Sequence, residues 1–174
     1  PMFALTFCVM RKDAYTAEIV PAMQGFKFGI WGHDTVVLHE HEIRKSTGPF
    51  GVLRTDRALR TRFMDELNAL IETAPMTIFA SVIDKAKHRT KYANPWNPYE
   101  IALHFCMEQL HILMTAENQH GKTVHVVFES RGPKEDKELE LEFRRIAGND
   151  RHWGYKRHDF SRFDFQPVFI PKAA

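Results

Sequence analysis

The sequence has little cysteine, no long apolar run and almost no net charge. Its two cysteines, Cys8 and Cys106, each lie among apolar neighbours. This placement favours buried free thiols in a reducing compartment over a disulfide, so we expect a cytoplasmic protein. No apolar run approaches the roughly 20 residues that a membrane span requires, which argues against a membrane partner. The N-terminus also lacks the basic and apolar segments of a signal peptide.

The charged residues are nearly balanced. There are 24 lysines and arginines and 22 acidic residues, which gives a formal net charge of +2. This balance is compatible with a polyanionic partner, but it is too small to indicate nucleic acid by itself. The length of 174 residues and the hydrophobic fraction of 44% are those of one globular domain that can bury a core.

Strand-like and helix-like segments alternate along the chain, which predicts an α/β protein. Asp56 is expected to cap an amphipathic helix that ends at Pro75, and Asn97 to cap a second helix that begins at Pro98. A further helix is expected from about Asp13 to Val20, and another from Lys134 to Ala147. The expected strands are 3–10, 35–38, 76–83, 123–128 and 163–170, with an extended segment at 39–45 and a basic loop at 86–92.

Glu129 is the first candidate for chemistry. It follows the apolar run 123–128 and precedes a tight basic turn, Ser130 to Gly132, after which a helix begins. A strand that delivers an acid beside cations and a helix N-terminus is a common way to place a metal-binding carboxylate at a sheet edge. Alternatively, Glu129 caps the turn and pairs with Arg131, because carboxylates at strand ends are ordinary.

A series of short motifs resembles, in its order and spacing, the domain-of-unknown-function 3800 family, whose members are predicted to be ribonuclease-H-like. The resemblance spans nearly the whole chain. The family's opening Asp-Glu-Ser-Gly strand and its closing helix are absent here. The matching motifs are Leu38-His39, Glu42-Ile43, Gly48-Pro49-Phe50, Val82-Ile83-Asp84-Lys85, Asn97-Pro98-Tyr99, Ala102-Leu103-His104-Phe105, Phe128-Glu129-Ser130-Arg131-Gly132 and Lys134-Glu135-Asp136.

The resemblance implies a ribonuclease-H-like mixed sheet flanked by helices. Residues 1–174 would form a single domain that lacks its first strand and last helix, with 11–75 as a helical insertion between the second and third strands. The third and fourth strands would run in the same direction. Asp84, Lys85 and Glu129 would therefore finish at one edge of the sheet.

The resemblance also assigns roles to the residues at that edge. A metal-dependent nuclease would bind Mg²⁺ or Mn²⁺ through carboxylates and hydrolyse phosphodiester bonds of RNA or DNA. Asp136 is open to a second interpretation, because acids in the first turn of a helix often serve the helix dipole. The expected catalytic residues are Glu129, Lys85 and Asp84, the metal ligands are Glu129 and Asp136, and the substrate-binding residues are His39, Glu42, Arg131 and Lys134.

Histidines and cations elsewhere in the chain leave alternatives open. His39 and His41, two residues apart on an extended segment, could hold zinc, but no third ligand stands at a recognisable spacing. His104 and His111 are expected to be hydrogen-bonded residues of a core or its flank. Basic residues interleaved with aromatic ones, at 85–96 and 151–162, could track phosphates and stack on unpaired bases, or form solvated loops.

The sequence is therefore compatible with three functions. The first is a metal-dependent nuclease. The second is a catalytically silent domain that binds nucleic acid or protein on the same scaffold, and the third is a phosphoryl-transfer enzyme with a small substrate. Because both ends of the sequence look cut within the fold, unpaired strand edges and self-association are also expected.

Overall fold

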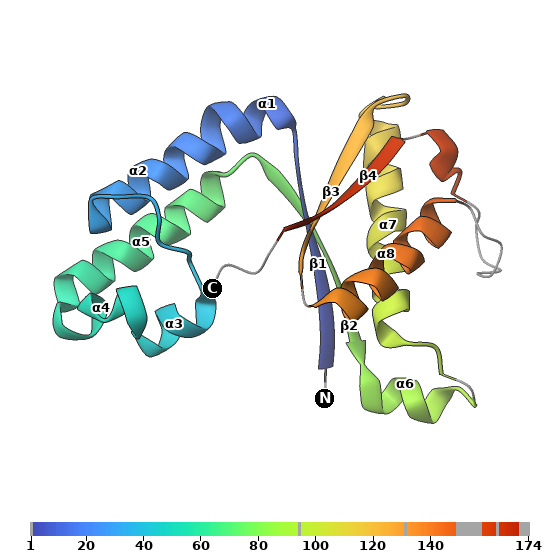
Figure 1. The fold of residues 1–174 in the computed structure, drawn as a ribbon, viewed down its shortest axis with the longest axis horizontal. Coiled ribbons are helices and arrows are strands. Elements are labelled where there is room, and N and C mark those ends of the chain that lie inside the picture. Colours follow the sequence, from blue (N-terminus) through green and yellow to red (C-terminus); the bar gives the residue numbers. More distant parts are fainter. Residues whose placement is uncertain (1, 94, 131, 149–157, 163, 171–174) are drawn as a thin grey trace. The chain divides into compact units, whose positions relative to one another are not determined.

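The computed structural model describes residues 2–93, 95–130, 132–148, 158–162 and 164–170. The chain is a mixed α/β protein and divides into two compact units (Figure 1). The strand unit comprises Pro1–Val9 and Ile78–Ala174. The helical unit comprises Met10–Thr77 and contains the segment 11–75 that the resemblance describes as an insertion.

The strand unit holds two separate two-stranded sheets. In one sheet β1 (Met2–Met10) pairs with β2 (Met76–Asp84), and in the other β3 (Thr123–Glu129) pairs with β4 (Asp164–Ile170). β3 and β4 are parallel, with Thr123 opposite Asp164 and Glu129 opposite Ile170. The helical segments of this unit are α6 (Lys85–Lys91), α7 (Pro98–Ala116), α8 (Pro133–Ala147) and the 3₁₀ turn η3 (Phe160–Arg162).

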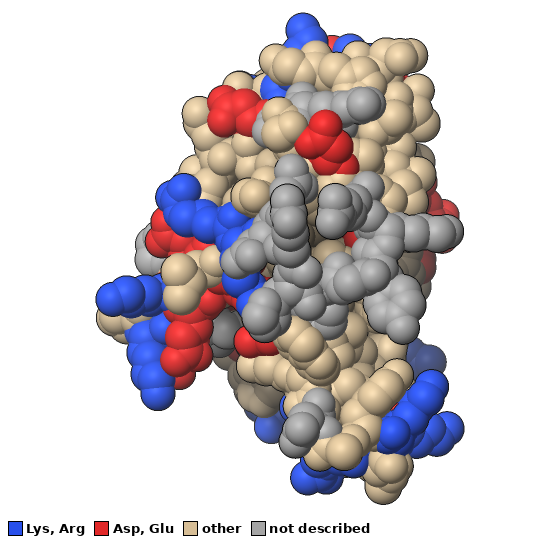
Figure 2. Space-filling view, turned by 90° about the vertical axis from the view of Figure 1, so that its right-hand side faces the viewer, with Lys and Arg blue, Asp and Glu red and all other residues tan. Residues whose placement is uncertain are grey.

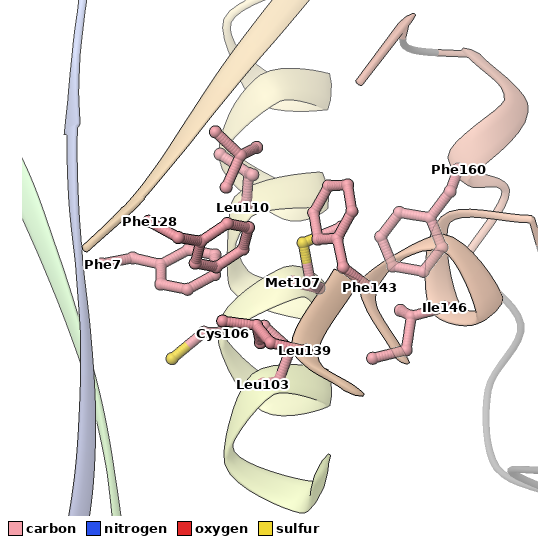
Figure 3. Packing of buried hydrophobic residues seen from close by; sticks show 11 residues of the cluster. Phe7, Leu103, Cys106, Met107, Leu110, Phe128, Leu139, Phe143, Ile146 and Phe160 are labelled. Carbon is pink, nitrogen blue, oxygen red and sulfur yellow. The ribbon is translucent and has the colours of Figure 1, made fainter. Parts of the chain in front are cut away.

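One apolar core joins the strands and helices of this unit. Figure 3 shows Phe7 of β1 and Phe128 of β3 pointing toward the α7 side chains, with Phe143 of α8 close by. The Phe128 and Phe143 rings meet edge to face, with centroids 5.7 Å apart. Leu103 and Met107 of α7 are completely buried between these elements. The core therefore depends on contacts among segments that are far apart in the sequence.

The opposite face of the strands is exposed and carries both polar and large apolar side chains. Side chains alternate between the two faces of a strand, so each inward residue has outward neighbours. In β3, Val126 is 9% exposed while Val127 is 56% exposed. The other large exposed aliphatic residues on β2 and β4 are Ile78, Val82, Val168 and Ile170.

The helical unit is built from helices that bury their own aromatic core. The rings of Phe50 and Phe63 meet edge to face at 6.0 Å, and Trp31 packs edge to face on Phe50 at 5.4 Å. Trp31 Nε1 donates to the Pro49 carbonyl at 3.0 Å, which satisfies the one polar atom of the indole. The elements are α1 (Lys12–Ala14), the π-helical turn η1 (Tyr15–Ile19), α2 (Val20–Trp31), α3 (Glu40–Lys45), the 3₁₀ turn η2 (Gly48–Phe50), α4 (Val52–Thr55) and α5 (Arg57–Thr73).

The expected helix caps are present in both units. The Asp56 carboxylate accepts a hydrogen bond from Leu59 N at 2.9 Å at the start of α5. The Asn97 side chain accepts one from Tyr99 N at 3.0 Å at the start of α7. Each cap satisfies an amide that has no partner within its helix. The predicted starts of these two helices are confirmed.

Three local predictions are wrong. Residues 35–38 do not form a strand, because Val36 is buried among the helices of the helical unit and no described strand pairs with the segment. Residues 40–45 form α3 instead of an extended segment, so His39 and His41 do not alternate as on a strand. Residues 85–91 form α6 instead of a loop, because Asp84 caps them. Capping and packing outweighed local composition in each segment.

The two cysteines differ in their surroundings. Cys106 is buried, and its thiol lies 3.7 Å from the Leu5 carbonyl. Burial raises the pKa of this thiol. Cys8 is exposed, which corrects the prediction that it is buried: it lies on the outward face of β1, where the strand period places it opposite the core. Within the described residues, no helix is long and apolar enough to cross a membrane.

Candidate functional site

Glu129 lies at the C-terminal end of the parallel strand pair. It is the last residue of β3 and is exposed, with Ile170 opposite it on β4. The pairing continues one residue further, since Ser130 N donates to the Ile170 carbonyl at 2.8 Å. The ladder therefore fixes the backbone at Glu129 and leaves its carboxylate at the solvent-facing edge.

The turn after Glu129 is tied to the first turn of α8. The Ser130 hydroxyl donates to the Asp136 carboxylate, and Asp136 N donates to the Gly132 carbonyl at 2.9 Å. Gly132 has φ 136°, and a Cβ there would lie 3.1 Å from Glu135 Oε2, so glycine suits this position. Asp136 thus has a structural role at the helix start that accounts for its position.

Two further residues predicted to bind substrate, Arg131 and Lys134, belong to this turn and to the helix that follows it. Lys134 is in the first turn of α8 and is exposed, two residues before Asp136. Arg131 lies outside the described residues. Both assignments stay predictions.

Asp84 and Lys85 have local partners at the end of β2. The Asp84 carboxylate accepts from Ala86 N at 3.0 Å and from Lys87 N at 3.2 Å, and so caps α6. The hydrogen bond from the Lys87 amide is the main cause that lowers the pKa of Asp84. Lys85 Nζ lies over the Phe3 ring, 5.5 Å from its centroid. This cation–π contact places the ammonium beside β1.

The strands that carry the predicted acids run the same way. In Figure 1, β2 leads down into α6 and β3 leads down into α8, whereas β1 runs upward from the N-terminus. Asp84 and Glu129 therefore occupy the ends of two strands that share a direction. Their role together in catalysis stays a prediction.

His39 and Glu42 belong to the helical unit. His39 occupies the N-cap position of α3, and Glu42 lies in the first turn of that helix. The Glu42 carboxylate packs near Gly48, where an added Cβ would lie 3.7 Å from Oε1. Gly48 has φ 56°, in the left-handed region that favours glycine. The contacts of Glu42 thus lie within its own unit, and substrate binding by either residue stays a prediction.

The basic segment after β2 presents its cations from a short helix. His88 Nε2 lies 2.8 Å from the Trp96 carbonyl, and the His88 and Tyr92 rings pack 5.3 Å apart. Lys91 Nζ lies 5.5 Å from the centre of the Tyr92 ring. Figure 2, which looks onto the right-hand side of Figure 1, shows lysines and arginines gathered at the lower end, the end at which α6 lies. The second basic segment, 151–157, lies outside the described residues.

A cluster of histidines and one carboxylate lies on the flank of α7 and includes His104 and His111, which were expected to be hydrogen-bonded there. Glu108 Oε1 lies 3.3 Å from His104 Nε2 and 3.7 Å from His158 Nε2. The His111 ring packs on the His158 ring with centroids 4.8 Å apart. The spacing 104, 108, 111 places three of these residues on one helix face, so their proximity could have been predicted from the sequence. The contact with His158 could not, because that residue is distant in the sequence.

Burial affects the protonation of His104. The side chains of His104 and Glu108 are only 15% and 20% exposed. Burial lowers the pKa of His104, and the neighbouring Glu108 opposes that shift. A carboxylate between two imidazoles can accept a proton and pass it on.

A metal centre is not complete in the described part of the chain. No three histidine, cysteine or acidic residues there are grouped so that they could hold a metal ion. Asp84 and Asp136 are committed to a helix cap and to the Ser130 hydroxyl. Glu129 is the one predicted ligand whose position at a strand end suits a cation without a competing structural role. The described residues therefore do not fit a two-metal centre.

Comparison with known proteins gives a distant relative. The uncharacterized protein y4pM of Sinorhizobium fredii (strain NBRC 101917 / NGR234) is 27% identical over 117 residues. The match covers 65% of this chain and 43% of that protein, so the chain spans less than half the length of its relative. No protein-family model and no solved structure matches the chain.

Proposed function

We propose that this protein is a metal-dependent nuclease with a ribonuclease-H-like domain of the domain-of-unknown-function 3800 type. The observation that carries the proposal is the exposed Glu129 carboxylate at the C-terminal end of the parallel β3–β4 pair. Sheet ends of this kind are where α/β proteins place their binding residues. The remaining support is the resemblance in motif order, which is an analogy of fold and not of chemistry.

The strand arrangement supports the finer fold assignment. β1 pairs with β2 and β3 pairs with β4, and no described residues pair β1 with β3. Nevertheless Phe7 of β1 and Phe128 of β3 enter the same core against α7 (Figure 3). One further strand between β1 and β3 would join the two sheets. The resemblance implies such a first strand, so the separate pairing of β1–β2 and β3–β4 supports the proposal.

A metal-dependent nuclease would need more carboxylates than Glu129 alone. Glu129 would supply one carboxylate for Mg²⁺ or Mn²⁺, which prefer oxygen ligands. The other acids would have to come from outside the described residues. If they lie on the first strand and last helix that the resemblance implies, residues 1–174 alone should cleave RNA or DNA weakly or not at all.

The test is a charge-neutral substitution at Glu129 in the full-length protein. Glu129→Gln keeps the shape of the side chain but removes the charge, so it should abolish Mg²⁺- or Mn²⁺-dependent cleavage and leave stability nearly unchanged. Glu138→Gln, at an exposed position of α8, is the matched control and should keep full activity. Lys85→Ala should reduce turnover less severely than Glu129→Gln. Retained cleavage by Glu129→Gln, with contaminating nuclease excluded, would contradict the assignment.

A binding module without catalysis is the second candidate. It is favoured because the described residues bring no three histidine, cysteine or acidic residues together as metal ligands. The two candidates differ in one measurement: a full-length protein that binds nucleic acid but cleaves none, with either metal present, belongs to the second.

A further inference from the structure

A hollow lined by arginines lies on the helical unit. It has a volume of about 530 Å³ and opens to solvent where α4 meets α5. Three guanidinium side chains and Thr61 supply its polar lining, Leu53 and Met64 its apolar lining, and Asp65 is its one acid. The arginines are Arg54, Arg57 and Arg60.

These three arginines differ from the other arginines of the helical unit. Arg11 pairs with Asp13, Arg44 with Glu40, and Arg62 with Glu66, each within the ion-pair distance. Within the described residues, the three arginines of the hollow form no ion pair with an acid. They thus gather positive charge that the fold itself does not neutralise.

Buried side chains and hydrogen bonds anchor the two helices that carry these arginines. Leu53, beside Arg54, is 2% exposed, and Phe63 of α5 is fully buried in the same core. The Asp56 cap fixes the corner between α4 and α5. Arg62 Nη2 donates to the Gly29 carbonyl at 2.7 Å and holds α5 to α2. These contacts anchor the backbone that carries the three arginines.

We propose that this hollow binds the sugar-phosphate backbone of a single-stranded nucleic acid. Arg57 and Arg60 are three residues apart, so their Cα atoms lie about 4.5 Å apart along the helix axis, and their long side chains can reach successive phosphates. Guanidinium groups bind phosphate oxygens in pairs, which suits a fork of this kind. Met64 and Leu53 supply an apolar surface for sugars. The inference rests on the proposed function, because the strand it holds is the substrate of that nuclease.

The experiment measures binding separately from cleavage. A fluorescently labelled oligonucleotide of about 20 nucleotides, in one RNA and one DNA version, is titrated with the 1–174 protein in EDTA at several salt concentrations. The variant Arg54→Gln/Arg57→Gln/Arg60→Gln should bind at least about tenfold more weakly. Its slope of log affinity against log salt should fall by about two, since each lost contact to a single strand contributes about 0.7.

A control variant removes the same charge from arginines that are already paired. Arg11→Gln/Arg44→Gln/Arg144→Gln also lowers the net charge by three, but each of its arginines contacts an acid in the folded chain. It should keep wild-type affinity within about a factor of two, because a nonlocal change in charge acts weakly at physiological salt. All six positions are exposed, so circular dichroism and urea unfolding should show both variants folded.

The outcomes separate this inference from the nuclease proposal. Equal loss of affinity in both variants, or no binding by the wild type, overturns the hollow as a nucleic-acid site. Weakened binding confined to the Arg54, Arg57 and Arg60 variant supports it, whatever the cleavage assay shows. Loss of the nuclease assignment through Glu129→Gln would leave this binding result standing, because EDTA removes any metal-dependent step.

Discussion

The helical unit and the strand unit differ in how completely they bury their apolar side chains. In the helical unit, Phe50 and Phe63 are fully buried and the aromatic rings around them close on one another. In the strand unit, Phe143 is equally buried on one side of the strands, but Val82 and Val127 on the other side are more than half exposed. The helical unit closes its aromatic core itself, although Phe28 and Ile71 stay 53% and 49% exposed. The strand unit buries one face of its strands and leaves large aliphatic residues of the other face exposed.

Backbone hydrogen bonding adds a second difference between the units. A helix pairs its amides and carbonyls within itself, so a few helices can bury their apolar stripes against each other and be complete. A strand satisfies half of its groups with each neighbour, so an edge strand stays incomplete until another strand pairs with it. The helical unit is therefore expected to be self-sufficient, and the strand unit to recruit further polypeptide.

Core truncation should give the largest effects and should stay within one unit. Phe63→Ala and Phe143→Ala each remove a buried ring and should cost about 3–5 kcal/mol. Amide hydrogen exchange should show lost protection mainly in α2 and α5 for the first variant, and mainly in α7, α8 and β3 for the second. Equal loss across both units in either variant would show that the two cores unfold together, and the comparison would fail.

Removal of a helix cap should have the next largest effect. Asp56→Ala in the helical unit and Asn97→Ala in the strand unit should each destabilise by about 1 kcal/mol, because an amide loses its acceptor. Glycine at the same positions should cost only a few tenths of a kcal/mol relative to the native cap. Urea unfolding measures both substitutions. An Ala variant as stable as the wild type would show that water replaces the cap.

The pH dependence should arise in the strand unit. Burial lowers the pKa of His104 below its ordinary value of 6.5, while Glu108 opposes the shift. The unfolded chain thus takes up the proton more readily than the folded chain. The stabilising contribution is full above about pH 6.5 and is lost as pH falls through the lowered folded-state pKa. His158 and Glu142 also face this imidazole and modulate the shift.

The variant His104→Gln isolates that contribution. Urea unfolding between about pH 8 and pH 5 should show a steeper loss of stability in the wild type than in the variant on the acid side of pH 6.5. Parallel curves for the two proteins would mean that His104 titrates alike in the folded and unfolded states. The hydrogen exchange of α2 and α5 should be indifferent to this substitution.

Substitution on the exposed strand face should change stability least and association most. Val82→Thr/Val127→Thr alters exposed side chains, so the free energy of unfolding should change by less than about 0.5 kcal/mol. If the open face drives self-association, sedimentation should show a smaller associated fraction than for the wild type. Leu141→Thr, at a position of α8 that is 70% exposed, is the control. A monomeric wild type at high concentration would contradict the expectation of self-association.

Local signals in the sequence predicted local structure well. The caps at Asp56 and Asn97 depend on contacts two or three residues away, and the Glu140–Arg144 ion pair at 2.7 Å joins neighbours on one helix turn. The end of β3 at Glu129 follows from its apolar run. By contrast, residues 85–91 looked like a basic loop by composition, and only the Asp84 cap shows why they are helical.

The candidate site was predictable only where its parts are adjacent in sequence. Glu129 and the turn to Asp136 could be read directly, because eight residues contain both the strand end and the helix start. The cluster of His104, Glu108 and His158 could not, since a segment 50 residues away closes it. The arginine hollow was missed for a related reason: Arg54 and Arg57 lie on two helices whose angle the sequence does not state.

The sequence by itself determined the alternation of helices and strands, the helix caps and the position of Glu129, because these depend on interactions between near neighbours along the chain. Tertiary structure alone decided which strands pair, which face of each strand is covered, and which charges are left without an acid. Those outcomes depend on contacts between distant segments, and the same residue pattern is compatible with more than one such arrangement until the core is packed. The division into a closed helical unit and an open strand unit is the result of that packing.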